Sequence, residues 1–319
     1  MQTRQLGRTN MEITPIGLGA WAIGGQWAGG WGPQDDDESI KTIHRALELG
    51  INWIDTAPVY GLGHSEEIVG RALKESKYKP YVFTKCSLVW DDKSVVGNNL
   101  SSSSLLRECE ASLRRLGVET IDLYQIHWPN PDRDIEEGWS TLAKLKQEGK
   151  IRAIGVSNFS VEQMKRAQEI APIDSLQPPY SLIHREADEE ILPFCSQNDI
   201  GVLVYSPMAS GLLSGAMNKE RIKDLADDDW RKHTSEFREP QLSANLELQN
   251  LLTDIGYPHN VSAGVVAVAW TLHNSAITGA IVGSRHPAQI EDTIMAGEFR
   301  LSDSEMEQIQ KFLAEHAYS

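Results

Sequence analysis

Four side chains capable of acid–base chemistry follow short apolar segments in the first half of the chain. Asp55 and Tyr60 come after "INWI", Lys85 ends "PYVFTK", and His127 follows "IDLYQI". A free tyrosine has a pKa near ~10 and donates protons poorly at neutral pH. A neighbouring ammonium group would lower that pKa, and a carboxylate would keep the ammonium charged and in place. The four residues therefore form a candidate site in which Tyr60 protonates a carbonyl oxygen and His127 orients the carbonyl.

The elements that must position these residues are strands alternating with helices. Apolar runs rich in β-branched residues recur at 13–19, 51–57, 80–86, 121–128, 151–158, 175–182, 201–207 and 277–284. Segments of helical period lie between them, and three of these end near Gly50, Gly117 and Gly149, as many helices do. Strands that alternate with helices form parallel sheets, and eight such units favour a closed (β/α)8 TIM barrel.

We expect residues 1–319 to form one barrel domain with an N-terminal β-hairpin and an additional C-terminal helix over 301–317. Residues 211–241 are charge-dense and too long for a plain connection, so they are either a mobile functional loop or a solvated insertion. The segment "GLGAWA" at 17–22 matches a dinucleotide-binding motif. That motif requires a helix next, and the glycine-rich sequence that follows favours a tryptophan-bearing loop.

The ends of the predicted strands carry further polar residues, which matters because TIM barrels place catalytic groups at the carboxyl ends of their strands. The polar residues at the fifth, sixth and seventh strands are Ser157, Asn158, Gln177, Tyr205 and Ser206. Taken alone, Lys85 also fits a strand-end lysine and His127 a core histidine. Their joint position at the ends of consecutive strands favours a shared site.

Residues 64–67 have a structural interpretation instead. Ser65 suits a helix N-cap, and Glu66 and Glu67 suit the first turn of the helix, where acids complement the helix dipole. His64 belongs to the same helix start. We therefore expect the active site to end at Tyr60 and a helix to begin after it.

The bulk composition limits the partners. A net charge of −15 and a pI near 5.1 argue against nucleic acids and anionic membranes. Three cysteines without a CxxC pair favour a reducing compartment over a disulfide framework or a zinc site, and no metal-ligand spacing appears. The first residues lack a signal peptide, and the longest apolar segment is too short to span a bilayer. We expect a soluble, cytoplasmic protein without a metal.

Six segments resemble the aldo-keto reductase superfamily, in the family's order and over nearly the whole chain. They are "GINWIDTAPVYGLGHSEEIVGRAL", "FTKCS", "SLRRLGVETIDLYQIHWPNP", "GKIRAIGVSNFS", "YSPMASGLLSG" and "IVGSRHPAQIED". The sequences of these segments are most similar to the bacterial and plant branch of the family, which also resembles potassium-channel β-subunits. The resemblance implies a (β/α)8 barrel that binds NADPH or NADP+ in an extended pose without a Rossmann domain. It places the catalytic tetrad on Asp55, Tyr60, Lys85 and His127.

The resemblance also implies a cofactor site that runs from the nicotinamide to the 2′-phosphate. Its residues are Trp21, Ser157, Asn158, Gln177, Tyr205, Ser206, Pro207, Gly211, Leu213, Gly283, Ser284, Arg285, Gln289 and Asp292. Tyr205 is expected against the nicotinamide ring, and the planar fork of Arg285 suits a phosphate dianion. Many members have lysine at the position of Gly283 and asparagine at that of Thr293, so NADPH preference and the adenine contact stay open. Trp21, Trp90 and Trp128 are expected to wall the substrate pocket.

Together these observations predict an NADP(H)-dependent oxidoreductase. Hydride would pass from the nicotinamide C4 to the carbonyl carbon of an aldehyde, with ketones as a second class, and Tyr60 would protonate the oxygen to give an alcohol. One alternative is a nucleotide-sensing regulatory subunit with the same fold and little turnover. Another is a metal-dependent hydrolase or lyase that uses Asp55, Glu66 and His127. We expect a small-molecule carbonyl substrate, no nucleic acid or membrane partner, and a monomer rather than an oligomer.

Overall fold

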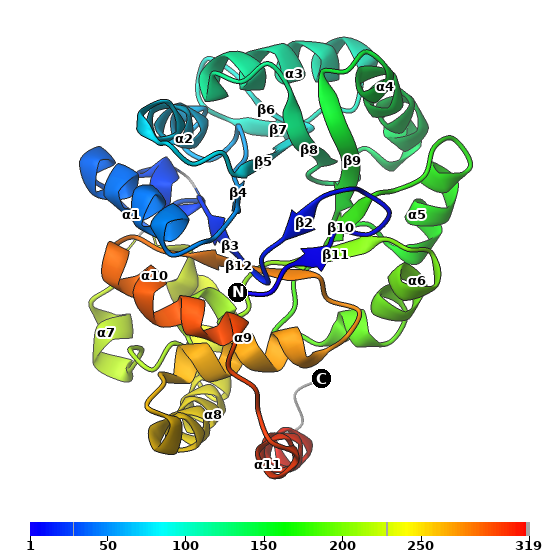
Figure 1. The fold of residues 1–319 in the computed structure, drawn as a ribbon. Coiled ribbons are helices and arrows are strands. Elements are labelled where there is room, and N and C mark those ends of the chain that lie inside the picture. The colour runs from blue at the N-terminus through cyan, green and yellow to red at the C-terminus, as the bar shows by residue number, and fades with distance from the viewer. Residues whose placement is uncertain (28, 228, 317–319) are drawn as a thin grey trace.

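Eight parallel strands close into a barrel in the computed structural model, which describes residues 1–27, 29–227 and 229–316 (Figure 1). In chain order the strands are β3 (Ile16–Gly19), β4 (Trp53–Asp55), β5 (Tyr81–Cys86), β8 (Ile121–Ile126), β9 (Ile151–Ser157), β10 (Ser175–Gln177), β11 (Gly201–Val204) and β12 (Gly279–Gly283). Each pairs in parallel with the next, and β12 pairs with β3 to complete the circle. Each of the eight predicted runs contributes one of these strands, which confirms the predicted TIM barrel.

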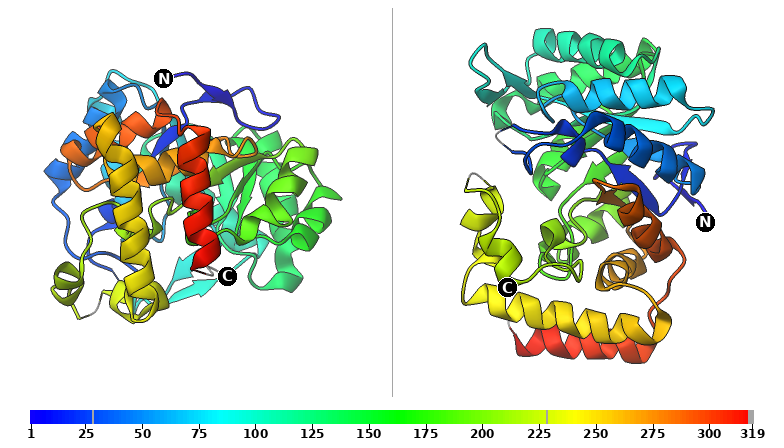
Figure 2. Two further views of the ribbon diagram at one scale, coloured as in Figure 1. Left: turned by 90° about the horizontal axis from the view of Figure 1, so that it is seen from below. Right: turned by 90° about the vertical axis from the view of Figure 1, so that its left-hand side faces the viewer.

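Helices surround the barrel, as Figure 1 shows. They are α1 (Asp36–Glu48), α2 (His64–Glu75), α3 (Ser102–Leu116), α4 (Ile135–Gln147), α5 (Val161–Gln168), α6 (Ile191–Gln197), α7 (Lys219–Lys223), α8 (Gln241–Gly256), α9 (Ala263–His273), α10 (Pro287–Thr293) and α11 (Asp303–Glu315). Gly117 follows α3 with a left-handed φ of 67°, as its place after a helical period predicted. The additional C-terminal helix is α11, which lies along α8 on the outside of the molecule (Figure 2). Ala317, at the end of its predicted span, lies outside the described residues.

The amino-terminal end of the barrel is closed by apolar packing. The predicted N-terminal hairpin consists of β1 (Arg4–Gln5) and β2 (Glu12–Ile13), which pair antiparallel. Leu6 and Ile13 from this hairpin pack with Trp53 and Phe83 from the barrel strands, and all four side chains are fully buried. A side chain on Gly17 would collide with Trp53, because its Cβ would lie 2.2 Å from the indole ring. The barrel is therefore a filled core, and only its other end is available for chemistry.

The structure corrects two local expectations and adds one hairpin that was not predicted. The sixth strand stops at Gln177 rather than continuing to 182, because Pro178 and Pro179 have no N–H to donate to a neighbouring strand. Ser65 is not an N-cap: α2 begins at His64, and the Ser65 hydroxyl instead donates to the backbone oxygen of Ala20 at 2.9 Å. An additional hairpin, β6 (Leu88–Trp90) with β7 (Val96–Asn98), follows β5.

The charge-dense segment 211–241 contains α7 and two short 3-10 turns, at Trp230–His233 and Ser235–Phe237. It buries Met217, Ile222 and Phe237, so it is packed onto the protein and is not a fully solvated insertion. Among the described residues, no helix combines the length and the apolar character that crossing a bilayer requires.

Candidate active site

Lys85 connects two other members of the predicted tetrad, Asp55 and Tyr60. Lys85 is the next-to-last residue of β5. Its ammonium group lies 2.5 Å from Asp55 Oδ1 and 3.2 Å from the Tyr60 hydroxyl. It also donates to the backbone oxygen of Thr56 at 3.0 Å. Lys85 is fully buried, and Asp55 and Tyr60 are nearly so. The strand ends therefore bring together the acid, the cation and the phenol that the sequence analysis selected.

Burial sets the protonation of these groups. Desolvation, and after it the negative charge of Asp55, raises the pKa of Tyr60 well above its ordinary value. The pKa of Tyr60 therefore moves upward, opposite to the lowering that the sequence analysis expected from the neighbouring ammonium. Burial lowers the pKa of Lys85, and Asp55 acts in the opposite sense. Tyr60 is consequently protonated at neutral pH, which is the form that a proton donor requires.

His127 lies beside Tyr60 at the same end of the barrel. It directly follows β8, and its ring meets the Tyr60 ring edge-on with centroids 5.9 Å apart. Burial, followed by the positive charge of Lys85, lowers the pKa of His127 well below its ordinary value. A neutral imidazole carries one N–H, so His127 can donate a hydrogen bond to an oxygen held near Tyr60.

An aromatic wall covers one side of Tyr60. The rings of Trp21 and Tyr60 have centroids 4.9 Å apart, and Trp27 lies 5.2 Å from Trp21. Both tryptophans lie in the loop after β3, where the structure has a short 3-10 turn and no α-helix, as expected when the dinucleotide motif was rejected. Within the described chain, no ring contact joins Trp90 or Trp128 to Tyr60. Trp21 and Trp27 thus both lie beside the Tyr60 ring.

The residues expected at the nicotinamide form a hydrogen-bonded chain next to the tetrad. The Gln177 amide donates to Asp55 Oδ2 at 2.8 Å, and the Ser157 hydroxyl donates to the backbone oxygen of Gln177 at 2.8 Å. The Tyr205 hydroxyl donates to the Asn158 amide oxygen at 2.9 Å. The Asn158 amide donates to the Ser157 hydroxyl at 3.1 Å, so the four residues form one hydrogen-bonded chain that ends at Asp55.

The segment expected at the pyrophosphate follows β11 as a tight turn. Ser206 has a φ of 55° and Gly211 a φ of 90°, so the backbone reverses through left-handed conformations at both positions. Pro207 lies between them, and the backbone N–H of Leu213 donates to the backbone oxygen of Met208 at 3.1 Å. The turn places these residues over the carboxyl end of the barrel.

The residues expected at the 2′-phosphate gather at the end of β12. Ser284 is buried, and within the described chain its hydroxyl has no hydrogen-bond partner. Arg285 is not free: its guanidinium donates to Gln34 Oε1 at 2.8 Å and to two backbone oxygens of the loop before α1. Gln289 accepts from the Arg285 backbone N–H at 2.6 Å. Gly283 is exposed, and Asp292 accepts from the Ser262 hydroxyl at 2.6 Å.

Arg231 belongs to this region although the sequence analysis did not select it. Its guanidinium stacks on the Trp31 ring at 4.7 Å from the centroid and pairs with Asp229 at 2.6 Å. Burial, and after it the positive charge of Arg231, lowers the pKa of Arg285, so the two guanidinium groups are close enough to repel. Arg231 is one of many charges in its segment, and no spacing signal distinguishes it there.

Glu66, one of the two acidic residues of the metal-dependent alternative, lies outside the candidate site. Glu66 accepts hydrogen bonds from Arg115 and Thr84, both at 2.7 Å, and is fully buried outside the barrel. Over the described ranges, no group of three His, Cys, Asp or Glu side chains is arranged to hold a metal ion. The structural interpretation of Glu66 agrees with these contacts.

Comparison with known proteins assigns the chain to a family. The model of the Aldo/keto reductase family matches residues 15–314. The aldo-keto reductase YhdN of Bacillus subtilis is 41% identical over 91% of this chain and 87% of its own length. The NADH-specific methylglyoxal reductase of Escherichia coli is 35% identical over 96% of both chains.

Solved structures agree with the sequence relatives. The glycerol dehydrogenase AKR11B4 from Gluconobacter oxydans superposes with a TM-score of 0.91, at 41% identity, over 100% of this chain and 96% of that one. The holo form of the aldo-keto reductase AKR11C1 from Bacillus halodurans gives a TM-score of 0.81 at 26% identity, over 98% of this chain and 96% of that one. The protein belongs to the aldo/keto reductase family and is an oxidoreductase.

Proposed function

We propose that the protein is an NADP(H)-dependent reductase that converts small aldehydes to alcohols, with ketones as a second class. The observation that supports this most directly is the buried Lys85 ammonium between Asp55 and the Tyr60 hydroxyl. That arrangement holds a protonated phenol in a site that excludes water. It is the geometry that a carbonyl reduction needs at the oxygen atom.

The side chains divide the chemistry of the proposed reaction. When bound, NADPH supplies a hydride to the carbonyl carbon. His127 donates a hydrogen bond to the carbonyl oxygen and fixes its orientation, and Tyr60 transfers its proton to that oxygen as the C–H bond forms. Lys85 stabilises the resulting phenolate, and Asp55 holds Lys85 charged. Tyr60 then regains a proton from solvent after the alcohol leaves.

The residues at the end of β12 fit the 2′-phosphate of NADPH. The buried Ser284 hydroxyl lacks a partner among the described residues and is available to a phosphate oxygen. Two guanidinium groups, Arg285 and Arg231, lie close enough to repel, and a dianion between them would relieve that repulsion. These features support NADPH over NADH. One relative is named as NADH-specific, and the titration below compares the two nucleotides.

For the substrate we propose short carbonyl compounds with a second oxygen next to the carbonyl. The named relatives act on methylglyoxal and glycerol, which are both small and carry adjacent oxygens. In this chain the Trp21 indole N–H is buried and has no partner within the described residues. Because its ring lies against that of Tyr60, Trp21 is a candidate donor to the second oxygen. We further propose a cytoplasmic monomer.

Cofactor titration followed by turnover tests the proposal. The purified protein is titrated with NADPH and with NADH while tryptophan fluorescence is followed, and then methylglyoxal or 4-nitrobenzaldehyde is added. We expect tighter binding of NADPH and aldehyde-dependent oxidation of the bound nucleotide. Binding without oxidation would favour a nucleotide-sensing subunit, and tighter binding of NADH would overturn the assigned preference.

A further inference from the structure

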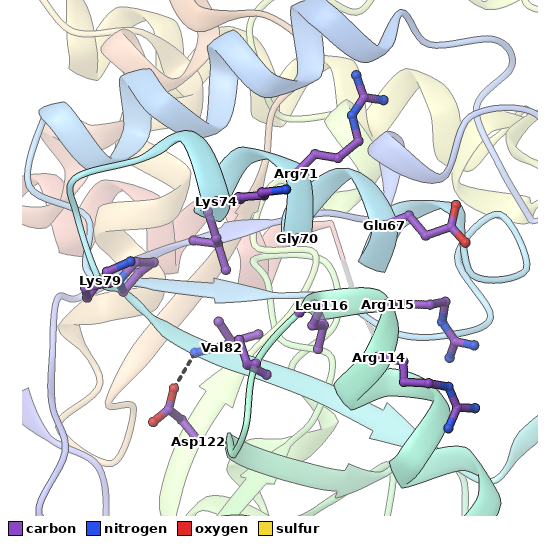
Figure 3. A pocket seen from close by; sticks show the side chains of 14 residues that line it. Glu67, Gly70, Arg71, Lys74, Lys79, Val82, Arg114, Arg115, Leu116 and Asp122 are labelled. Atoms are coloured by element: carbon purple, nitrogen blue, oxygen red, sulfur yellow. Dashed lines mark hydrogen bonds between the residues drawn. The ribbon is translucent and has the colours of Figure 1, made fainter.

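A groove lies between α2 and α3 on the outside of the barrel (Figure 3). Its floor includes Val82 and Asp122, which are the second residues of β5 and β8. The active-site residues Lys85 and His127 lie at the other ends of these strands. The groove is therefore separate from the site of reduction. Its volume of about 650 Å³ is within the range of roughly 300 to 1,000 Å³ that is typical of small-molecule sites.

The groove is cationic although the whole chain is strongly acidic. Five basic side chains and two carboxylates line it: Arg71, Lys74, Lys79, Arg114 and Arg115, with Glu67 and Asp122. Figure 3 shows that these cations come from both helices and from the segment before β5. On a protein with a net charge of −15, such a group creates a local field that attracts anions.

Several of these charges are already neutralised by ion pairs, and the remaining charges decide the sign of the net charge in the groove. Arg115 pairs with Glu66 at 2.7 Å, and Arg71 pairs with Asp36 at 3.2 Å. Asp122 accepts from Arg152 at 2.8 Å and from the Val82 backbone N–H at 2.8 Å, so its charge is balanced from outside the groove.

Three cations and one exposed carboxylate, Glu67, remain, so the net charge of the groove is positive. Lys74, Lys79 and Arg114 have no ion-pair partner anywhere in the described part of the chain, and all three are exposed at the rim. Figure 3 shows Lys79 at one end of the groove and Arg114 at the other, so the rim offers an unpaired cation to an anionic group at either end.

The walls below the rim are apolar. Leu73, Val82, Leu116 and Val118 line the groove, together with the aliphatic stems of its basic residues. Gly70 contributes no side chain, because α2 approaches the end of α3 closely there: a Cβ on Gly70 would lie 2.5 Å from the Arg115 backbone oxygen. A fully hydrated inorganic ion would leave these walls without a contact, whereas an organic anion would cover them.

We propose that this groove binds a small amphiphilic anion, that is, an organic molecule with an apolar body and one carboxylate, sulfonate or phosphate group. The apolar body lies against Leu73, Val82 and Val118, and the anionic group lies at one end of the rim, against either Lys79 or Arg114. Occupation at this position contacts both helices that flank β5. The proposal is independent of the cofactor and substrate assigned to the barrel mouth.

A fluorescent probe tests the site directly. Anilinonaphthalene sulfonate, an apolar ring system with one sulfonate, is titrated into the protein in the presence of saturating NADP+, which keeps the barrel mouth covered. We expect one bound probe per chain and an affinity that falls as salt increases. The double variant Lys79→Gln/Arg114→Gln is expected to bind about tenfold more weakly, since each exposed charge contributes a modest amount. The uncharged N-phenylnaphthylamine is expected to bind weakly to both proteins.

The matched control removes two exposed cations outside the groove, in the variant Lys223→Gln/Lys311→Gln. It should bind the sulfonate probe as the parent protein does. If the control variant loses binding to the same extent, the weaker binding arises from the overall charge of the protein and not from the groove. Unchanged binding in the groove variant, absence of probe binding while NADP+ is saturating, or equal binding of the neutral probe would each overturn the proposal. The substituted residues are exposed, so circular dichroism should show an intact fold in both variants.

Discussion

Lys85 is fully buried in contact with Asp55 and Tyr60, at the end of a strand whose other residues fill the core. Burying a charged lysine costs several kcal/mol unless a partner and further hydrogen bonds compensate. Asp55 and the backbone oxygen of Thr56 provide that compensation. The sequence identified these residues because each follows an apolar run. It could not give the pKa of Tyr60, since that depends on how much water the surrounding loops exclude.

Replacing Tyr60 by phenylalanine tests the proton donor. The variant Tyr60→Phe keeps the ring that packs against Trp21 and removes only the hydroxyl. We expect turnover to fall by roughly 10²- to 10⁴-fold, which is the usual contribution of a positioned general acid. NADPH binding, measured by fluorescence titration, should stay within about twofold. A variant that retains most of its rate would remove Tyr60 as the acid.

The pH dependence of reduction follows from the direction of two pKa shifts. The pKa of His127 lies well below its ordinary value, so the imidazole stays neutral as pH rises from 6 to 8. The pKa of Tyr60 lies well above its ordinary value, so the phenol stays protonated over the same range. Both groups are thus in their active forms, and the single-turnover rate should be flat there.

At alkaline pH the rate should fall. The pKa of Lys85 is lowered by burial, so the ammonium is lost at a lower pH than in a free lysine, and stabilisation of the phenolate is lost with it. Rapid-mixing measurements of NADPH oxidation from pH 5.5 to 10.5 check both parts. An inflection near the pKa of a free histidine, at about 6.5, would contradict a neutral, buried His127.

Trp21 provides a test of the substrate class. Trp21→Phe retains an aromatic ring beside Tyr60 and removes the unpartnered indole N–H. We expect KM for methylglyoxal to rise by about fivefold to tenfold, because one hydrogen bond contributes roughly 1 kcal/mol. Propanal, which has no second oxygen, is the matched control and should change by less than about twofold. Equal effects on both substrates would indicate that Trp21 acts by packing alone.

At the scale of elements, the sequence predicted the positions of strands and helices where the hydrophobic period and the helix-ending glycines indicate the same boundaries. All eight barrel strands lie within the predicted runs, and α3 ends at Gly117 as its pattern indicated. The hairpin β6–β7 was not recognised, because each strand is only three residues long and β7 contains Gly97 and Asn98, residue types that are depleted in strands. The role of Ser65 was also misread, since its partner Ala20 is distant in the sequence.

Gly17 in β3 provides a test of barrel packing. The variant Gly17→Ala places a methyl group where the Trp53 indole already lies, at 2.2 Å from the ring. The indole is fully buried and has no free space to move into, so we expect a loss of about 1 to 3 kcal/mol in the free energy of unfolding. Urea unfolding followed by circular dichroism measures this.

The control for this substitution is Gly97→Ala in β7. A Cβ at Gly97 meets no atom within 4 Å, and the residue is exposed. Its stability should change by less than about 0.5 kcal/mol, as is usual for surface positions. If both alanine variants lose the same stability, the effect arises from strand glycines in general and not from contact with Trp53.

At the scale of the whole molecule, three distant parts of the chain meet over the end of β12. Trp31 comes from the loop before α1, Arg231 from the segment after β11, and Arg285 from the strand end itself. Only closure of the barrel makes β3 and β12 neighbours, so no local pattern could have indicated this meeting. The sequence therefore predicted Arg285 through a motif but gave no sign that Arg231 and Trp31 lie beside it.

We propose that the loop before α1 and the segment after β11 close over bound NADPH at the end of β12. Substitution of Arg285 or of Arg231 tests this. Arg285→Ala should weaken NADPH binding by about tenfold to a hundredfold, which corresponds to one charge-assisted hydrogen bond of roughly 1.5 to 3 kcal/mol. NADH lacks the 2′-phosphate, so its binding should change little. An equal loss for both nucleotides would mean that Arg285 positions the loop before α1 and does not read the phosphate.

Arg231→Ala should act mainly on the rate of release. Its stacking on Trp31 connects the segment after β11 to the loop before α1, so loss of that contact should let the two separate more easily. Stopped-flow dissociation of NADPH should become faster by about tenfold, while the rate of association changes less, as is common for altered interfaces. The matched control is Lys223→Ala, an exposed cation of the same segment, which should release NADPH at the parent rate.

If release limits turnover, Arg231→Ala will also remove the burst of the first turnover and raise the steady-state rate, because lid opening sets many kcat values. A parent protein without a burst, together with unchanged release in Arg231→Ala, would show that these loops do not retain the cofactor.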